Sequence, residues 1–168
     1  MARIAKKLNS WVWWTLIGIA LFFLGREKPK EEEKTASWID LERVLKRELG
    51  DEPFLYIVDE TYYVPSTGEL NQFVAWWTSY LVTQKIKYIA NFFDCDNYSI
   101  LFTAMSFIMS KFHAGIANSK VHSYNVVVVQ EDGNLVPKII EPQTGAVFSI
   151  EHAMSKGKDY QTRWIYYT

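Results

Sequence analysis

Residues 92–107 read FFDCDNYSILFTAMSF, and this stretch decides the expected fold class. From Tyr98 to Met109 the chain is nearly all apolar, and the length of that run favours a buried helix over a strand. Asp94 is a natural N-cap, which places Cys95 in the first helical turn. Unpaired backbone N–H groups and the positive end of the helix dipole lie at that turn. We therefore expect a thiol at the start of a central buried helix.

The chain upstream of this stretch predicts a helix, a strand and a loop. From Trp38 to Leu49 the apolar residues recur with helical spacing, and Gly50 is a suitable residue to end that helix. Residues 53–59 read PFLYIVD and predict a short buried strand, and residues 61–68 predict a Pro/Gly-containing loop.

A second helix has a recognisable start. Ser66 and Glu69 stand three residues apart, as in a capping box, and apolar residues continue with helical spacing from Leu70 to Leu81. We expect this helix to continue to about Ile89.

Downstream of the central helix the pattern changes to β-structure. Val121 to Gln130 is rich in β-branched residues, residues 131–134 contain an Asp-Gly turn, and Leu135 to Glu141 supplies a partner strand. Two more strands are expected at Ala146–Ile150 and Arg163–Tyr167. Because helices precede antiparallel strands, the predicted class is α+β, with a central helix packed on an antiparallel sheet.

Composition limits the classes of protein to consider. The 168 residues have room for one ordinary domain and an appendage, and 49% of them are hydrophobic. The formal net charge of −1 gives no electrostatic footprint for nucleic acid, so we expect no nucleic-acid partner. The single cysteine, Cys95, excludes a disulfide scaffold and a four-cysteine zinc site within one chain. It is therefore either a small buried apolar residue or a reactive group.

An apolar N-terminal segment stands apart from the rest of the sequence. Trp11 to Leu24 carries no charge, the run approaches membrane-spanning length when it is counted from Leu8, and its tryptophans suit the headgroup region. The length also fits a signal peptide, but no small-x-small triplet follows Leu24. We therefore expect an uncleaved single-pass anchor that contacts the lipid bilayer through residues 8–24.

Charges on either side of this segment predict its orientation. Three basic residues and no acidic one precede it, whereas residues 26–34 carry four basic and four acidic residues. The positive-inside rule puts the N-terminus in the cytoplasm and the main domain on the extracytoplasmic side. The chain then divides into an anchor or signal segment (1–25), a charged linker (26–37) and a folded domain (38–168).

His122 is the candidate base for the thiol. It is expected on the strand after the central helix, where alternation can turn its ring inward and Ser123 outward. If the hairpin turn centres on residues 132–133, paired residue numbers sum to 265 and His122 faces Gln143. Glu141 and Gln143 then both lie near the ring, and a carboxylate or amide at hydrogen-bond distance can hold an imidazole in place.

Other residues compete with this assignment or oppose it. His113 falls at the far end of the helix, about five turns from Cys95, which makes it a poor base. His152 follows a strand and remains an alternative. Asp94 and Asp96 flank the thiol and oppose formation of a thiolate, so a nearby cation is required.

Three motifs, together with a lead-in, resemble a known family. They are FFDCDNYSILFTAMSF at 92–107, VHSYNVVVV at 121–129 and IIEPQTG at 139–145, preceded by IVDETYYVPSTGEL at 57–70. In this order they resemble the papain-like cysteine protease domain at the C-terminus of the mushroom agglutinin MOA and its bacterial and phage relatives. In that family a Cys between two Asp residues begins the central helix, a His followed by Asn lies on a strand, and a Glu in a Glu-Pro-Gln setting completes the triad.

The resemblance implies a papain-like fold and a Cys95–His122–Glu141 triad that hydrolyses peptide bonds. Gln143 and Asn125 are the implied substrate-binding or supporting residues. A peptide or protein is the implied substrate.

The resemblance also bears on cofactors and on the oxyanion site. Activity in the mushroom protein depends on calcium, for which Asp94 and Asp96 are the candidate ligands here, although the sequence itself requires no cofactor. A helix-capping role for Asp94 competes with that assignment. Gln84 lies too far upstream to be assigned as an oxyanion-binding amide.

The expected function is a membrane-anchored cysteine hydrolase that cleaves a peptide or amide bond, with phage among its expected sources. The alternative is a catalytically inactive papain-like fold that serves as a structural or binding protein of a membrane or virion. A third interpretation is a small membrane protein with a buried cysteine.

Overall fold

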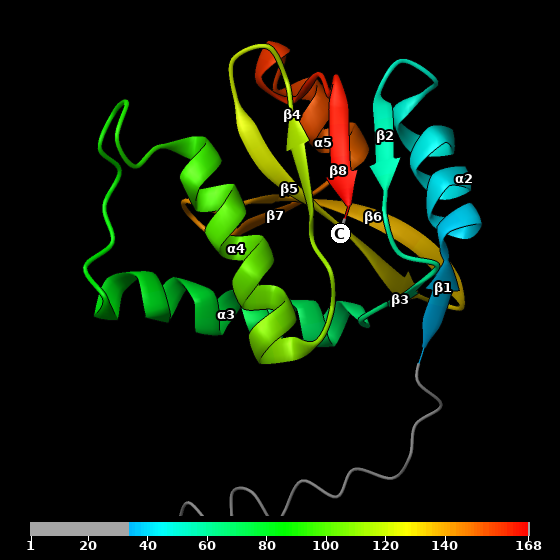
Figure 1. The fold of residues 1–168 in the computed structure, drawn as a ribbon, viewed down its shortest axis with the longest axis horizontal. Coiled ribbons are helices and arrows are strands. Elements are labelled where there is room, and N and C mark those ends of the chain that lie inside the picture. Colours follow the sequence, from blue (N-terminus) through cyan, green and yellow to red (C-terminus); the bar gives the residue numbers. More distant parts are fainter. Residues whose placement is uncertain (1–33, 168) are drawn as a thin grey trace, which may run out of the picture. The chain divides into compact units, whose positions relative to one another are not determined.

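A six-stranded sheet forms the centre of residues 34–167, the part of the chain that the computed structural model describes (Figure 1). Its strand order is β2-β8-β4-β5-β6-β7, and all neighbours are antiparallel except β2 and β8, which are parallel. The expected all-antiparallel sheet is therefore wrong for this pair. The strands are β2 (Phe54–Ile57), β8 (Trp164–Tyr167), β4 (Gly115–Asn118), β5 (Ser123–Glu131), β6 (Asn134–Glu141) and β7 (Ala146–Ser149).

Helices cover both faces of the sheet. Val126 and Val128 of β5 pack into one core with α2 and α5, and Val127 and Val129 pack into a second core with α3 and α4. This alternation fits a central strand, whose two faces are both buried. The α+β class is confirmed. The helices are α2 (Trp38–Leu49), α3 (Thr67–Thr83), α4 (Cys95–Ser110), α5 (Ile150–Ser155) and the 3₁₀ turn η1 (Lys158–Tyr160).

Local signals explain where α3 begins and ends. The capping box at the start of α3 is confirmed: Ser66 Oγ accepts from the Glu69 N–H at 3.3 Å, and Glu69 Oε2 accepts from the Ser66 N–H at 2.8 Å. The predicted end near Ile89 is wrong. The helix stops at Thr83, and Lys85 adopts a left-handed φ of 56° that no α-helix continues through.

The hairpin that carries the site has the predicted register. Asn125 pairs with Ile140 and Glu131 with Asn134, so partner numbers sum to 265 as expected. The two turn residues Asp132 and Gly133 have φ values of 49° and 80°, as a tight type I′ hairpin turn requires.

Several short elements differ from the sequence prediction. The strand expected at 53–59 is β2, and it is not buried: Phe54 is 69% exposed because β2 lies at the sheet edge. Within the expected loop 61–68, Thr61–Tyr63 forms β3, which pairs with β1 (Thr35–Ser37). Residues 35–37, assigned to the linker from sequence, thus form a strand. The strand β4 and the helix α5 were not predicted.

Among residues 34–167, no helix is both long enough and apolar enough to cross a membrane. The predicted anchor, residues 8–24, lies outside the described residues.

Candidate active site

Cys95 is the first residue of α4, and its side chain is partly buried. Asp94 before it has extended backbone angles, and its N–H donates to Asn97 Oδ1 at 3.1 Å. The first helical hydrogen bond then runs from the Tyr98 N–H to the Asp94 carbonyl. The predicted position of the thiol in the first turn is therefore confirmed, where the helix dipole favours negative charge.

His122 directly precedes β5 and is held by a short turn. Its N–H donates to Ser119 Oγ at 3.0 Å, and its carbonyl accepts from the Ser119 N–H at 2.9 Å. Two details of the prediction are wrong: His122 is not itself on the strand, and Ser123 is buried rather than outward. The turn holds His122, so β5 begins one residue later, at Ser123. Ser123 points inward and donates to Asn118 Oδ1.

Glu141, the last residue of β6, contacts the His122 ring. Its Oε2 lies 2.6 Å from His122 Nε2, and the two side chains are only 12% and 17% exposed. The same oxygen accepts from the Tyr160 hydroxyl at 2.9 Å, and Oε1 accepts from the Gln143 N–H at 3.4 Å. Because a carboxylate only accepts, we assign the ring proton to Nε2, which leaves the lone pair on Nδ1.

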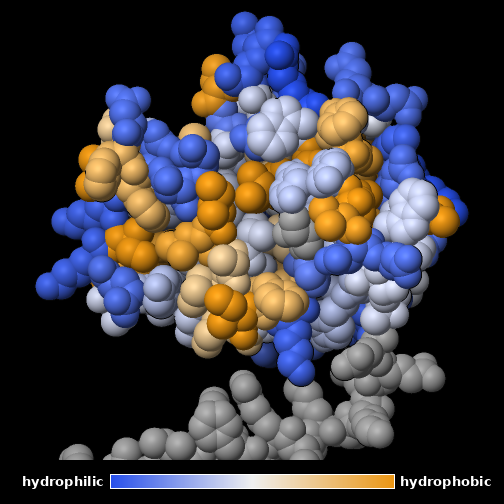
Figure 2. Space-filling model, viewed as in Figure 1, coloured by the Kyte–Doolittle hydropathy of each residue, from blue (hydrophilic) through white to orange (hydrophobic). Residues whose placement is uncertain are grey.

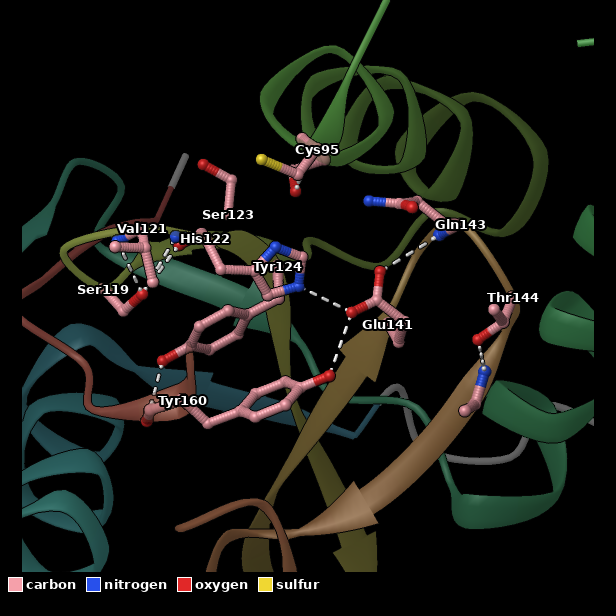
Figure 3. A network of polar contacts seen from close by, with 12 residues as sticks. Cys95, Ser119, Val121, His122, Ser123, Tyr124, Glu141, Gln143, Thr144 and Tyr160 are labelled. Carbon is pink, nitrogen blue, oxygen red and sulfur yellow. Dashed lines mark hydrogen bonds and ion pairs between the residues drawn. The ribbon is translucent and has the colours of Figure 1, made fainter. Parts of the chain in front are cut away.

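Two tyrosines pack beneath the imidazole (Figure 3). The His122 ring lies edge-on to Tyr160, with centroids 5.6 Å apart, and is tilted against Tyr124 at 5.9 Å. Burial, followed by the Glu141 charge, raises the pKa of Tyr160 above its usual value. Burial also raises the pKa of Tyr124, to about 12. Both phenols therefore keep their protons at neutral pH, and Tyr160 remains a donor to Glu141.

Cys95 and His122 line the same cleft, which has a volume of about 350 Å³. Figure 3 shows the thiol at the start of α4 above the imidazole, with Glu141 at the far side of the ring. The ring nitrogen that is not engaged with Glu141 lies on the side facing Cys95 (Figure 3). This arrangement can perform acid–base chemistry on a thiol. The remaining lining residues are Asp94, Asp96, Asn118, Ser119, Lys120, Val121 and Ser123.

The two predicted supporting residues occupy different places. Gln143 extends its side chain from the β6–β7 turn toward the space between Cys95 and Glu141 (Figure 3). Asn125 is fully buried and does not line the cleft. Its Nδ2 donates to the Ser99 carbonyl at 3.1 Å and to Thr103 Oγ1 at 2.9 Å. Asn125 thus fixes the helix that carries the thiol against β5.

The candidate calcium ligands, Asp94 and Asp96, flank Cys95 at the start of α4. A side-chain hydrogen bond between Asp94 and Asp96 raises the pKa of Asp94 and lowers that of Asp96. Within residues 34–167, no group of three or more His, Cys, Asp or Glu side chains is placed to hold a metal ion. Two neighbouring carboxylates fall short of the six to eight oxygens that calcium takes.

The competing residues lie elsewhere in the described domain. His113 lines a second cleft along the C-terminal half of α4, and its ring contacts Tyr62 and Phe107. His152 is exposed on α5, where its ring is tilted against Phe148, and Gln84 is exposed at the end of α3. None of the three lines the cleft that contains Cys95.

Tyr160, Ser119 and Asn118 were not identified from sequence. Tyr160 lies in the three-residue 3₁₀ turn η1, which is too short for a pattern of apolar residues to identify Tyr160 as a buried or functional residue. Ser119 precedes His122 by three residues, the spacing of a side-chain-capped turn, and that signal was available.

Comparison with known proteins places the fold. No protein-family model and no curated protein matches the sequence. The structure of the PSL1a–E64 complex is 20% identical, covers 79% of this chain and 51% of its own, and superposes with a TM-score of 0.59. A Polyporus squamosus lectin, solved with a human-type influenza-binding epitope, is also 20% identical and covers 79% of this chain and 49% of its own, with a TM-score of 0.57. The described domain therefore has the α+β fold found in these lectin structures, and the chain spans about half of their length.

Proposed function

We propose that this protein is a cysteine hydrolase that cleaves peptide or amide bonds, with Cys95 as nucleophile, His122 as base and Glu141 as the residue that orients the ring. One observation supports the proposal most: the imidazole that shares a cleft with the thiol is held by a carboxylate 2.6 Å from its Nε2. A histidine oriented in this way presents Nδ1 for proton transfer. The fold shared with a protein solved in complex with E64 adds support.

The chemical steps use the residues in order. Nδ1 of His122 takes the thiol proton, and the sulfur attacks the substrate carbonyl carbon to form a tetrahedral oxyanion. The C–N bond then breaks, the imidazolium gives its proton to the departing amine, and an acyl-thioester on Cys95 remains. Water, deprotonated by the same imidazole, attacks the thioester, which releases the acid and restores the thiol.

The start of α4 contributes to two of these steps. Its positive end stabilises the thiolate, and we assign the backbone N–H groups of Cys95 and Asp96 as donors to the oxyanion. Asp94 and Asp96 oppose the thiolate, so the imidazolium must be the main counter-charge.

Thiol labelling tests the proposal. The full-length protein is treated with E64, an epoxide that alkylates reactive thiols, and the adduct is followed by intact mass. We expect rapid labelling of Cys95 in the wild type and slow labelling in His122→Ala, with His152→Ala as the matched control. Equal, slow labelling of all three proteins would contradict a hydrolase and would favour a papain-like fold that serves only as a binding or structural protein.

We further propose that residues 8–24 anchor the protein in a bilayer, with the N-terminus cytoplasmic and the domain on the other side. The basic residues before the segment and its tryptophans support this orientation. In a bacterial expression host, we expect the protein to resist carbonate extraction and the domain to be digested in spheroplasts by added protease. Release by carbonate would contradict the anchor without affecting the hydrolase.

A further inference from the structure

The half of the sheet farthest from β7 presents exposed aromatic residues. Phe54 and Tyr56 of β2 are 69% and 52% exposed, and Trp164 and Tyr166 of β8 are 46% and 40% exposed. Tyr56 and Tyr166 stack with centroids 5.1 Å apart and planes 6° from parallel. These four residues, here called the aromatic face, line a shallow groove of about 410 Å³. Figure 2 shows pale aromatic and orange apolar surface together on this side of the molecule.

The aromatic face continues directly from the cleft that holds Cys95. Ser123 pairs with Asn118, Asn118 pairs with Trp164, and Trp164 pairs with Phe54. Residues paired across neighbouring strands point to the same face of a sheet. These four paired residues form a row across the sheet. The row begins at two residues that line the cleft, Ser123 and Asn118, and ends on the aromatic face.

Strand spacing gives the reach of this row. Neighbouring strands lie about 4.8 Å apart, so Trp164 is roughly 10 Å from Ser123, two strands away. An extended peptide advances about 3.3 Å per residue and covers that distance in about three residues. A substrate whose scissile bond lies beside Ser123, in the cleft that also holds Cys95, thus places a side chain about three residues away over Trp164.

We infer that the aromatic face is a substrate subsite that takes a large apolar or aromatic side chain about three residues from the scissile bond. The inference rests on the proposed hydrolase and names its substrate class. The cleft itself is lined mainly by polar side chains, so apolar selectivity has to come from a neighbouring surface. Exposed Tyr and Trp rings bind apolar side chains through area and ring contacts and keep their polar atoms in water. A peptide is the occupant because the row starts at the nucleophile's own cleft.

Quenched fluorescent peptides test the inference with the full-length protein in detergent. One set carries Phe, and a matched set carries Ala, at each position two to four residues on either side of a cleavable bond. We expect kcat/KM to favour Phe by about tenfold at one position near the third, a ratio typical of apolar subsites. Phe54→Ala and Trp164→Ala should reduce that ratio to near one, whereas Tyr88→Ala, which removes an aromatic residue that is 53% exposed elsewhere, should leave it unchanged. Thermal melting of each variant verifies folding.

The outcomes separate the inference from the proposed function. Cleavage without a Phe preference, or with a preference that survives both substitutions, overturns the subsite and leaves the hydrolase intact. If no peptide is cleaved, the same peptides are tested for binding to Cys95→Ala. Binding that needs both Phe in the peptide and Trp164 in the protein then supports the subsite without the hydrolase. The absence of such binding overturns the subsite. Loss of self-association or of phosphatidylcholine-vesicle binding in Trp164→Ala, with the Phe preference unchanged, would assign the face to a second copy or a bilayer instead.

Discussion

The two ends of α4 each have a cleft and a histidine, but their surroundings differ. At the N-terminal end, His122 contacts a carboxylate at 2.6 Å and shares a mainly polar cleft with Cys95. At the C-terminal end, His113 lies between Tyr62 and Phe107, in a cleft of about 380 Å³ lined by apolar side chains and Thr103.

This difference shows what makes a histidine a candidate base. Both rings pack against aromatic residues, so packing alone does not distinguish them. The distinguishing features of the N-terminal end are a thiol in the same cleft as the histidine and the positive end of a helix. Substitutions at the two ends of α4 test whether reactivity follows these features.

The largest expected effect comes from removing each ring in turn. His122→Ala should lower the rate of Cys95 alkylation, and kcat/KM on a cleaved peptide, about 10³-fold, because the thiol loses its proton acceptor. His113→Ala should leave both rates within about threefold of wild type. Stopped-flow alkylation at pH 7 measures the first rate. Similar losses in the two variants would erase the distinction between the two ends.

Glu141→Gln keeps the size and shape of the side chain. It should lower the rate of Cys95 alkylation and kcat/KM on a cleaved peptide roughly 10²-fold. An amide donates to Nε2 and so moves the ring proton to Nδ1, where it blocks transfer from the thiol. Glu131→Gln is the matched control. Glu131 Oε2 lies 2.7 Å from Lys138 Nζ, and neither residue lines the cleft. A Glu141→Gln protein that alkylates at more than half the wild-type rate would show that ring orientation is not needed.

Buried tyrosines under both ends predict a loss of stability at high pH. Burial raises the pKa of Tyr124, beneath His122, to about 12, and also raises that of Tyr167, whose hydroxyl donates to the His113 carbonyl. The folded state holds these protons beyond the unfolded pKa of about 10, so the stabilisation is complete below pH 10 and is lost as pH rises through the folded pKa.

Urea unfolding between pH 8 and 12 measures this loss. We expect the free energy of unfolding to be flat up to about pH 10 and then to fall. Tyr124→Phe should remove up to about 2 kcal/mol of the fall by pH 12, since burial raises the pKa of Tyr124 from about 10 to about 12. An identical slope in Tyr124→Phe and wild type would refute the assignment.

Tyr160 and Tyr167 should separate reactivity from stability. Tyr160→Phe removes the 2.9 Å hydrogen bond to Glu141 Oε2 and should slow alkylation about fivefold, the equivalent of one hydrogen bond. Tyr167→Phe removes the bonds to the His113 carbonyl and the Val128 N–H. It should lower the free energy of unfolding by about 1–2 kcal/mol and leave alkylation unchanged. The reverse pattern would place Tyr160 among purely structural residues.

The sequence predicted most where the signals are local. The capping box at Ser66, the start of α4 and the β5–β6 register each depend on a few neighbouring residues, and all three are confirmed. The strands β1, β3 and β4 have three or four residues each and form only by pairing with distant segments, which no local pattern encodes. The parallel β2–β8 pair was missed for the same reason.

In the candidate site the same contrast holds. Cys95, His122 and Glu141 stand in recognisable motifs, and the hairpin register already placed Glu141 near the ring. Tyr160 comes from a 3₁₀ turn 19 residues beyond Glu141, so only the folded chain brings its hydroxyl to the carboxylate. Asn125 was expected near the site, but it is buried under α4 because its parity on β5 matches Val127 and Val129.

The smallest expected effect concerns the acidic residues at the thiol end of α4. The hydrogen bond from Asp94 lowers the pKa of Asp96, so Asp96 is charged at neutral pH and its charge opposes a thiolate at the adjacent Cys95. Two unit negative charges about 7 Å apart in water repel each other by roughly 0.6 kcal/mol. Asp96→Asn should therefore raise the alkylation rate two- to threefold at pH 7, and the gain should shrink in 1 M salt, which screens the charge. Asp159→Asn, which removes a charge in η1 outside the cleft, should change nothing. A slower Asp96→Asn protein would mean that Asp96 acts through the start of α4, where it accepts from the Asn97 N–H at 2.9 Å, rather than through its charge.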